Sequence, residues 1–401
     1  MRTVLFVGAG RHQRRAILRA KELGLRVVTV DANPEAPGLA HADVPVVLDF
    51  RDVDAVTQVG RANAVDGVLT VSVDRAVPVV AAVAERLGLP GIGTRTAHLM
   101  THKVAMRREL AAAGVPQPRY AAVRVRREIF AAAEAVGFPA VLKPADSGGQ
   151  RGVFLLGSVN DLDRHLRAAL AESPTGEVIV ESYHEGLELN GLVVAHDGQV
   201  KPLTLSDRLR PPGPGFGVGW IHVYPSELFG DPLAEAERIA AQAVRTLGLR
   251  NGIAFPQLLV SGGEVRVVEV AARIPGGQMA DLAWHAVGVD LVEIALRQAL
   301  GEEVPDEMIR PRFSKPLAIR FFTSSPGPLP PGKVKSIGGL ERVLASAGVV
   351  QADVFIAVGD TIRPVRVDAD RRGYVIAVGE TNVQALERAE VAAMRLYVET
   401  E

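Results

Sequence analysis

The first ninety residues alternate short apolar runs with segments whose apolar residues recur every three to four positions. Buried strands are predicted at Val4–Val7, Val27–Val30 and Gly67–Val71, because continuous aliphatic runs are typical of strands covered on both faces. Helices are predicted at Ala16–Leu23 and Arg75–Leu87, each followed by a glycine that can end a helix. Strand–helix alternation of this kind predicts an open α/β sheet.

The remainder of the chain predicts a connecting helix, a small α+β unit and a strand-rich region. The connecting helix is expected at Ala97–Ala113, and the strand-rich region extends from Glu188 to Val270 around a helix at Leu233–Leu247. Within the α+β unit, residues 120–182, the predicted elements are helix Ile129–Val136, strand Ala140–Lys143, strand Val153–Leu156, helix Leu162–Leu170 and strand Val178–Glu181. Beyond it the predicted elements are helices Gln278–Ala286 and Leu291–Leu300, strands Leu317–Thr323 and Tyr374–Val378, and helix Asn382–Tyr397.

Composition narrows the class of protein. The 401 residues include 45 basic and 46 acidic side chains, so neither a nucleic-acid partner nor an acidic membrane surface is expected. The absence of cysteine excludes disulfides, thiolate metal sites and a cysteine nucleophile. No apolar run reaches the roughly 18 residues of a membrane span, and the N-terminus lacks the pattern of a signal peptide. A cytoplasmic protein is therefore expected.

Two glycine motifs imitate nucleotide-binding loops without their chemistry. Gly8-Ala9-Gly10 follows the first strand, but Gln13 occupies the third glycine position of a dinucleotide fingerprint, which favours a tight turn in a Rossmann-like domain. The segment Gly327–Val334 resembles a P-loop, yet its prolines lack the N–H groups that cradle phosphate, which favours a structural loop.

The strongest signal for phosphate binding is the segment Ala140–Val153, AVLKPADSGGQRGV. A short apolar run ends at Lys143, and a glycine-rich loop follows Pro144. Glycines allow consecutive backbone N–H groups to approach an anion closely, and the lysine adds a positive charge. The same segment would suit a solvent hairpin, so the neighbouring motifs decide between the two.

Carboxylates and an arginine end two further predicted strands. Glu181–Glu188, ESYHEGLE, presents acidic residues where a buried strand turns, and VRVVEVAAR places Glu269, Ala271 and Arg273 on one strand face. Glu269 and Arg273 therefore form either a simple ion pair or a Mg²⁺ ligand beside a phosphate-binding arginine.

Together these segments resemble the ATP-grasp superfamily, most closely its carboxylate–amine ligases of the amino-acid (dipeptide) ligase type. The likeness covers nearly the whole chain and rests on residues 72–110, AVLKPADSGGQRGV, VIVESYHEGLELN and VVEVAARIPGG in that order. It implies an α/β fold, α+β in parts: a Rossmann-like N-terminal domain, an ATP-grasp fold with a small lid subdomain, and a C-terminal α+β portion. The implied boundaries are an N-terminal domain 1–95, a helical connection 96–118, a lid 119–184, a core with the metal strand 185–310, and a C-terminal region 311–401.

The resemblance also implies roles for individual residues. Phosphate contacts are expected from Lys103 and Lys143, and the closing loop is expected to run from Ser147 through Gly148 and Gly149 to Gly152. Glu181 and Tyr183 are expected near the adenine and Glu188 near the ribose, with Glu269 as the Mg²⁺ ligand. Arg273 is expected to stabilise the transferred phosphoryl group or the acyl phosphate, and with Lys143 it forms the implied catalytic pair.

Two departures from the family pattern concern the metal. An acidic residue commonly precedes the metal strand by one hairpin, where this chain has Gln257, and an asparagine commonly follows the metal-strand glutamate, where this chain has Ala271. A glutamine carbonyl ligates Mg²⁺ without supplying charge, and an alanine does not ligate. Gln257 therefore stands as a second metal-ligand candidate, and the number of metal ions is left open.

The resemblance implies that a carboxylate attacks MgATP to give an acyl phosphate, which an amine converts to an amide or peptide. ATP and Mg²⁺ are the implied cofactors, with Mn²⁺ as a substitute metal. Small-molecule carboxylates and amines are the implied partners, and the apolar N-terminal helices permit a homodimer. Substrate contacts are expected in the loop Arg208–Trp220 and in Ile274–Gln278, namely Arg208, Arg210, His222, Gly276 and Gly277. The alternatives are a carboxylase-like or purine-pathway ATP-grasp enzyme, a nucleotide-binding protein without ligase activity and, last, a dehydrogenase.

Overall fold

A parallel sheet begins the chain. In the computed structural model, which describes residues 1–123, 128–212 and 217–401, its strand order is β3-β2-β1-β4. The strands are β1 (Thr3–Val7), β2 (Arg26–Asp31), β3 (Val44–Val47) and β4 (Gly67–Leu69). Helix α1 (Arg11–Glu22) packs on the face that carries Val4 and Phe6, while α2 (Val53–Ala62) and α3 (Val77–Leu87) pack on the face of Leu5 and Val7. The expected α/β unit is confirmed.

The predicted connecting helix Ala97–Ala113 is wrong as a single element. It is divided into α4 (Thr94–Leu99) and α5 (Lys103–Ala112). His102 is the N-cap of α5, and its ring nitrogen accepts a hydrogen bond from the Ala105 amide at 3.4 Å. The break places Lys103 on the first turn of a new helix, where its own amide donates to the Ala145 carbonyl at 2.7 Å.

The lid unit is an antiparallel sheet of order β5-β8-β6-β7 with two helices on one face. Its elements are β5 (Tyr120–Val123), α6 (Ile129–Val136), β6 (Ala140–Pro144), β7 (Phe154–Leu156), α7 (Val159–Ala171) and β8 (Val178–Ser182). Ser158 and Asp161 form a capping box at the start of α7. The elements predicted from the sequence in this region are confirmed to within a few residues.

A long antiparallel sheet forms the centre of the molecule, in the order β13-β12-β9-β10-β11-β14-β18-β16. Its strands are β9 (Leu187–His196), β10 (Gln199–Leu209), β11 (Ile221–Tyr224), β12 (Gly252–Ser261), β13 (Glu264–Ala271), β14 (Leu317–Phe321), β16 (Val349–Val354) and β18 (Gly373–Val378). Alternate residues of β9 enter different cores: Leu192 and Val194 pack towards α9 (Met279–Val287) and α10 (Leu291–Ala299), whereas Val193 and Ala195 pack towards α8 (Asp231–Thr246).

The C-terminal residues contribute to the central sheet and add a small sheet of their own. That sheet has the order β17-β15-β19, with β15 (Gly332–Gly338), β17 (Thr361–Ile362) and β19 (Tyr397–Thr400). The remaining helices are α11 (Asp306–Ile309), α12 (Leu340–Leu344) and α13 (Asn382–Ala393). The predicted helix Asn382–Tyr397 is therefore too long, because the chain turns after Ala393 and Tyr397 begins an edge strand.

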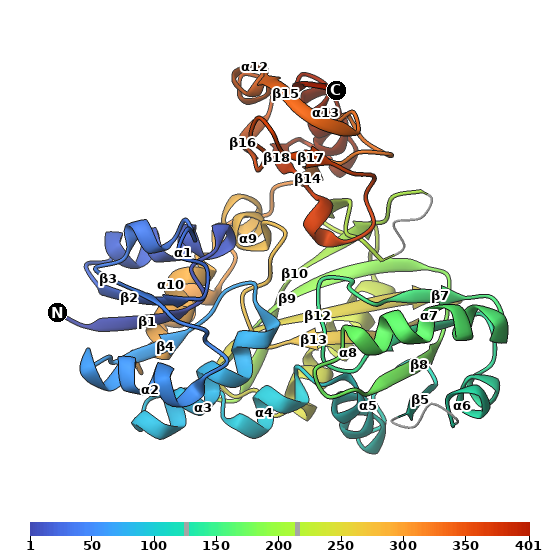
Figure 1. The fold of residues 1–401 in the computed structure, drawn as a ribbon, viewed down its shortest axis with the longest axis horizontal. Coiled ribbons are helices and arrows are strands. Elements are labelled where there is room, and N and C mark those ends of the chain that lie inside the picture. Colours follow the sequence, from blue (N-terminus) through green and yellow to red (C-terminus); the bar gives the residue numbers. More distant parts are fainter. Residues whose placement is uncertain (124–127, 213–216) are drawn as a thin grey trace.

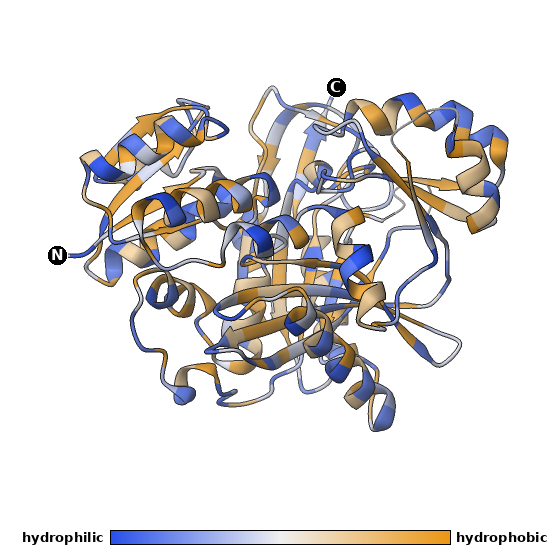
Figure 2. Cartoon of the chain, turned by 90° about the horizontal axis from the view of Figure 1, so that it is seen from below, coloured by the Kyte–Doolittle hydropathy of each residue, from blue (hydrophilic) through white to orange (hydrophobic). Residues whose placement is uncertain are grey.

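Figure 1 shows the N-terminal unit and the lid unit on opposite sides of the central sheet, whose C-terminal strands β14, β16 and β18 lie at the top of the view. Figure 2 shows apolar residues concentrated on the strands and polar ones on the outer surfaces of several helices. Among the described residues, no helix combines the length and apolarity needed to cross a bilayer. Loops from all three regions converge on one side of the central sheet, where the candidate site lies.

Candidate functional site

The lid loop joins β6 to β7 and is tied to α5 by a lysine. Lys103 is 7% exposed, and its Nζ donates to the Ser147 carbonyl at 2.7 Å. The same Nζ lies 3.3 Å from Oε1 of Glu269 on β13. Because one ammonium group contacts both the lid loop and the strand opposite, Lys103 is placed where an anion between them would meet a positive charge.

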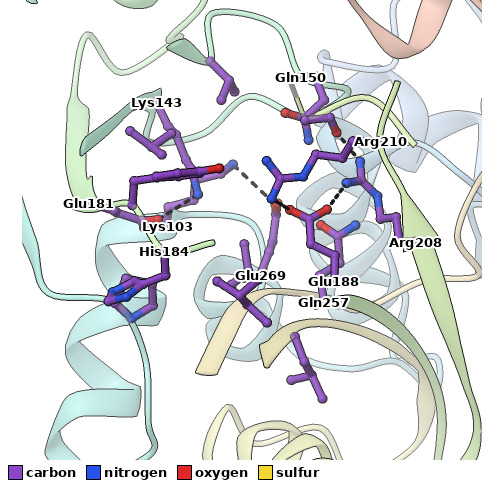
Figure 3. Close-up of a pocket in the computed structure, with 18 of the residues that line it drawn as sticks. Lys103, Lys143, Gln150, Glu181, His184, Glu188, Arg208, Arg210, Gln257 and Glu269 are labelled. Atoms are coloured by element: carbon purple, nitrogen blue, oxygen red, sulfur yellow. Dashed lines mark hydrogen bonds and ion pairs between the residues drawn. The ribbon is translucent and has the colours of Figure 1, made fainter. Parts of the chain in front are cut away.

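Lys143 belongs to a buried network of three charges beneath the lid loop (Figure 3). Glu181 Oε2 lies 2.7 Å from Lys143 Nζ, and Glu181 Oε1 lies 2.8 Å from Nε of Arg107. Burial disfavours the charged carboxyl, yet Arg107 and Lys143 outweigh it and lower the pKa of Glu181 to about 2. The carboxylate therefore fixes Lys143 at the base of the cleft, and two cations share its one negative charge.

Glu188 is the centre of a second ion cluster, on the far wall of the same cleft (Figure 3). Its carboxylate pairs with Arg208 and lies 2.6 Å from Nη2 of Arg210. Arg208 also donates to the Gly217 carbonyl, which positions the end of the β10–β11 loop. Residues 213–216 of the expected substrate loop Arg208–Trp220 lie outside the described residues.

Oxygen donors lie side by side on three adjacent strands. Gln257 of β12 is in register with Glu269 of β13 on one side and with Asn190 of β9 on the other. The Gln257 amide donates to Asn190 Oδ1 at 3.3 Å, and Glu269 is 30% exposed to the cleft. One carboxylate beside two amide oxygens fits Mg²⁺, which prefers oxygen ligands and keeps waters and phosphate oxygens in its shell. Among the described residues, no cluster of three or more His, Asp or Glu forms a self-sufficient metal site.

Arg273 follows the metal strand and is held by the N-terminal unit. Its Nε and Nη2 lie 2.8 and 2.9 Å from the two carboxylate oxygens of Asp74. Burial opposes both charges, yet each partner outweighs it, so the pKa of Asp74 is lowered and that of Arg273 is raised. Its Nη1 has no hydrogen-bond partner and is buried. The guanidinium is thus permanently charged and fixed in orientation at the edge of the cleft.

Two connected cavities contain these groups. The lid cavity, about 850 Å³, is lined by Lys103, Lys143, the lid loop, Glu181, Glu188 and Glu269. The junction cavity, about 1260 Å³, is lined by His12, Asp74, His222, Arg273, Gly276, Gly277 and Arg371. Both are lined by Gly148, Gly149, Gln150, Arg208, Gln257 and Glu269. A group transferred at Glu269 would therefore pass from one cavity to the other.

The junction cavity ends in a cationic corner. Arg371 stacks over the ring of Phe321, with 4.4 Å from its Cζ to the ring centroid, and donates to the Gly219 carbonyl at 3.3 Å. His222 is 3% exposed, and burial, followed by the charges of Arg208 and Arg371, lowers its pKa well below the usual value. His222 is therefore neutral at physiological pH, and Arg371 supplies the positive charge.

The structure brings nearly all the sequence-predicted site residues to these cavities. Ser147, Gly148, Gly149, Tyr183, Glu188 and Arg210 line the lid cavity, and His222, Gly276 and Gly277 line the junction cavity. Gly152 is the exception: a Cβ there would lie 2.8 Å from Pro144 and 3.1 Å from Glu172. Its smallness serves the packing of the loop against α7, and it does not line either cavity.

Several residues of the site were not predicted. His12 is on the first turn of α1, Asp74 begins a short 3-10 helix before α3, and Arg371 lies in a loop before β18. The sequence predicted no site role for any of them, because they reach the cavity only through the docking of the N- and C-terminal units. Arg107, which fixes Glu181, lies on a helix face that the sequence pattern assigns to the core. Conversely, Asp31 Oδ2 accepts a hydrogen bond from the Ala9 amide at 2.8 Å. The acidic residue that a dinucleotide site would use to bind a ribose therefore stabilises the Gly8–Gly10 turn in this chain.

Comparison with known families agrees with this geometry. The domain described as "Carbamoyl-phosphate synthase L chain, ATP binding domain" matches residues 102–307, just over half of the chain, and the "ATP-grasp N-terminal domain" matches residues 18–91. The chain is an ATP-grasp protein. The expected superfamily, its α/β fold and its ATP-dependent ligase class are thereby confirmed. In this ATP-grasp chain the matched ATP-binding domain contains the lid loop, Glu188, Glu269 and Arg273.

The individual relatives and similar solved structures include three kinds of enzyme. A formate-dependent phosphoribosylglycinamide formyltransferase from Ignicoccus hospitalis is 28% identical over 409 residues, covering 98% of this chain and 95% of that protein. The crystal structure of an L-amino acid ligase from Bacillus licheniformis superposes with a TM-score of 0.86 at 21% identity, covering 100% and 99% of the two chains. The biotin carboxylase domain of the Hydrogenobacter thermophilus 2-oxoglutarate carboxylase, crystallised with MgADP, ADP and bicarbonate, superposes with a TM-score of 0.79 at 19% identity, covering 99% and 90% of the two chains.

The C-terminal residues have a match of their own. Residues 327–401 match the "L-amino acid ligase C-terminal domain 2". The full-length curated relatives nevertheless favour the purine-pathway alternative over the expected amino-acid ligase, so the substrate class predicted from the sequence is supported only as far as an ATP-dependent ligase.

Proposed function

We propose that this protein activates a small carboxylate with MgATP and transfers the resulting acyl group to an amine that carries an anionic group. The observation that supports this most directly is the shared boundary of the two cavities. Glu269, Gln257 and the lid residues Gly148–Gln150 line both. A nucleotide in the lid cavity would have its terminal phosphate beside an acceptor in the junction cavity.

The chain's own residues suit the charge changes of this reaction. A carboxylate oxygen attacks the γ-phosphorus and ADP departs; the amine nitrogen then attacks the acyl carbon, phosphate departs, and an amine proton leaves with it. Lys103, Lys143 and the lid amides neutralise the phosphates, while Arg273 faces the acyl phosphate and the oxyanion that develops from it. Mg²⁺ held at Glu269 and Gln257 would supply charge neutralisation between the phosphates.

Closure of the lid protects the intermediate. An acyl phosphate hydrolyses when water reaches it, so the cleft must exclude solvent during transfer. The loop is already drawn down in this structure: Lys103 binds its carbonyl at Ser147, and a Cβ on Gly148 would lie 2.5 Å from Asp74 Oδ2. We assign to Gly148 the role of letting the loop approach Asp74 this closely.

The anionic group of the amine substrate is proposed to bind at Arg371. This guanidinium is half-buried and held against Phe321; its Nε donates to the Asp368 carbonyl at 3.1 Å, and its nearest carboxylate oxygen, Asp368 Oδ1, is 3.6 Å away. A carboxylate or phosphate in the junction cavity would complete its hydrogen bonds in a low-dielectric corner, where charge-assisted bonds are strong.

The first candidate substrate pair is formate and phosphoribosylglycinamide. It is favoured by curated relatives that extend over almost the whole chain, including the I. hospitalis protein at 28% identity. The phosphate of a phosphorylated sugar amine would complement the arginines that line the junction cavity. This is the purine-pathway alternative of the sequence analysis, now placed ahead of the amino-acid ligase.

A second candidate is the ligation of two amino acids. It is favoured by residues 327–401, which match an L-amino acid ligase domain and include Arg371. In this case Arg371 would hold the α-carboxylate of the amine substrate. Both candidates share the acyl-phosphate chemistry and differ in the acceptor.

The decisive experiment incubates the protein with MgATP and measures ADP release with two substrate sets, followed by mass analysis of the products. One set contains formate and phosphoribosylglycinamide, and the other contains the pooled twenty amino acids. ADP release and a formylated product would support the first candidate, and a dipeptide the second. Absence of stimulated ADP release by either set, with ATP still bound, would contradict both and favour a nucleotide-binding role.

Assembly and location remain proposals of the same kind. We infer a homodimer, because apolar side chains such as Trp284 and Phe313 are 44% and 49% exposed, and the H. thermophilus domain is a dimer in its crystal structure. Light scattering of the purified protein tests this, and a monomer at micromolar concentration would contradict it. A cytoplasmic location is proposed from the absence of cysteine and from the small-molecule substrates.

A further inference from the structure

A third cavity lies behind the catalytic cleft, between the N-terminal unit and the central sheet. This rear cavity, of about 1160 Å³, is separate from the lid loop and from Glu269. Residues from β4 and α3 form one wall, and the start of β12, the β9–β10 turn and α10 form the other. The first residues of β12 extend beyond its pairing with β13, which begins at Phe255, so one side of the strand at Gly252–Ala254 is not covered by β13.

Most of the rear cavity is apolar. Its walls include Val77 and Val80 of α3, Leu69 of β4, Ile253 of β12 and Ala295 of α10. Val80 and Ala295 are only partly buried, because each side chain borders the cavity. A ligand with an apolar body would remove this surface from water, at about 25 cal/mol per Å².

One end of the cavity is polar and rich in acceptors. Gln298 donates through Nε2 to the Ala195 carbonyl at 2.8 Å, while its Oε1 is buried without a partner. Nδ1 of the adjacent His196 is also buried without a partner. Asp197 and Glu302 add two carboxylates, whose side chains are 81% and 35% exposed. This end therefore offers acceptors to a hydrogen-bond donor.

The charge of the rear cavity is opposite to that of the junction cavity. Arg273 is its one lysine or arginine, and two of the Arg273 nitrogens are paired with Asp74. The junction cavity has Arg151, Arg208, Arg273 and Arg371. Glu302 lies 3.9 Å from Nε of Arg2, and Asp197 lies 3.8 Å from Nε2 of His196, both at loose ion-pair distances. An anion that suits the junction cavity would meet these two carboxylates in the rear cavity, whereas an ammonium group would be attracted to them.

We propose that the rear cavity is a second ligand site, for a small molecule with an apolar body and a terminal amine. The apolar part lies against α3, β12 and α10, and the amine faces Asp197, Glu302 and Gln298. Residues Ala272–Ile274 line this cavity, and Arg273 lines the junction cavity as well. A ligand bound in this cavity therefore contacts the segment that carries Arg273, and its binding is expected to change the turnover rate.

A charge-matched series of indoles tests the site without knowledge of the natural ligand. Calorimetry or ligand-observed NMR with the full chain would compare tryptamine, indole and indole-3-acetate. Tryptamine is expected to bind saturably with a Kd of about 1 mM or lower, a range reachable by a ligand of this size. Indole is expected to bind more weakly, and indole-3-acetate weaker still. No saturable tryptamine binding, or equal binding of the acetate, would overturn the proposal.

Variants that fill the rear cavity test whether tryptamine binds there. Ala295→Phe and Val80→Phe enter from opposite walls, and each is expected to reduce tryptamine affinity at least about tenfold. Ala112→Phe makes the same change as A295F on the exposed face of α5 and is expected to leave affinity unchanged. Tryptamine binding that survives both filling variants, with melting curves showing them folded, would contradict the site.

The combined variant Asp197→Asn/Glu302→Gln tests the charge preference independently of packing. Both side chains are on the surface end of the cavity, so folding should be retained. The preference for tryptamine over indole-3-acetate is expected to fall at least about fivefold, and an unchanged preference would overturn the charge argument.

The link between the rear cavity and Arg273 is tested by measuring turnover of MgATP with and without saturating tryptamine. The kcat is expected to change in the natural chain and to stay constant in Ala295→Phe.

Discussion

Asp74 and Arg273, 199 positions apart in the chain, form a two-point ion pair that joins the N-terminal unit to the end of the metal strand. Beside this pair, the Ser72 amide donates to the Ile274 carbonyl at 3.0 Å. Arg273, the proposed catalytic arginine, therefore owes its orientation to a different domain. Rotation of the two units relative to each other would move Arg273 away from the boundary between the cavities.

This pairing predicts different costs for changes at its two ends. Arg273→Lys should lower kcat about 10²- to 10³-fold, because a point charge cannot reproduce the donors aimed at a developing oxyanion. Asp74→Asn should lower kcat less, about tenfold, and leave the KM for ATP unchanged, because the arginine remains but loses its alignment. Asp54→Asn, which breaks the surface pair with Arg86, is the matched control. Equal kcat in D74N and D54N would contradict a positioning role.

The phosphate lysine and the metal ligand should each be required for turnover. Lys143→Ala leaves Glu181 with one cation and removes a charge from the base of the cleft, and Glu269→Ala removes the one carboxylate of the oxygen-donor row. Each is expected to lower substrate-stimulated ADP release at least about 100-fold. Lys201→Ala removes an exposed lysine paired with Asp306 and should retain full activity. Turnover unchanged in both K143A and E269A would rule out the assigned site.

The metal site should respond to an added charge. Gln257→Glu places a second carboxylate in register with Glu269, so a divalent cation would meet two negative charges. The Mg²⁺ concentration that gives half-maximal ADP release is expected to fall several-fold, measured at constant ionic strength. The isosteric reverse, Glu269→Gln, should raise it. If Q257E left the Mg²⁺ requirement unchanged, Gln257 would not be close enough to the ion to ligate it.

Acid stability should depend on Glu181. Its folded pKa of about 2 lies below the usual 4.5, so the stability it contributes is complete above about pH 4.5 and is lost as the pH falls towards 2. Linkage puts that contribution on the order of 3 kcal/mol. Glu181→Gln lacks it at every pH, and urea unfolding should show the stabilities of the two proteins converging as the pH falls from about 4.5 towards 2. A constant difference across this range would contradict the linkage.

Arg371 is expected to affect the binding of the amine acceptor and not the binding of ATP. Arg371→Ala is expected to raise the KM for the amine substrate about 10- to 100-fold, because the substrate loses a hydrogen bond to a charged group. The KM for ATP is expected to stay unchanged. Arg371→Lys should restore part of the loss. Arg366→Ala, an exposed arginine of the same segment, serves as the control. An equal effect of R371A on both KM values would indicate a structural role.

How much the sequence predicts depends on whether the relevant contact is local. Apolar periodicity and helix-ending glycines suffice for the lid unit and the first sheet, where each element is defined by its own residues. The division of Ala97–Ala113 was missed because His102 caps a new helix, and a histidine is an uncommon N-cap residue. The residues Lys143, Glu188 and Glu269 are recognisable because a strand or a glycine loop positions them. Asp74, His12 and Arg371 are not, because only the docking of separate units brings them to the cavity.

The position of Arg371 has a consequence for how such enzymes diverge. The proposed phosphate lysines, the proposed metal ligand and Arg273 all belong to the stretch from Lys103 to Arg273, whereas Arg371 lines the junction cavity from beyond residue 327. Recombination that exchanges the end of the chain can thus give an inherited phosphoryl-transfer apparatus a new acceptor. A chimaera carrying another ligase's C-terminal segment would retain ATP activation and acquire the amine preference of the donor.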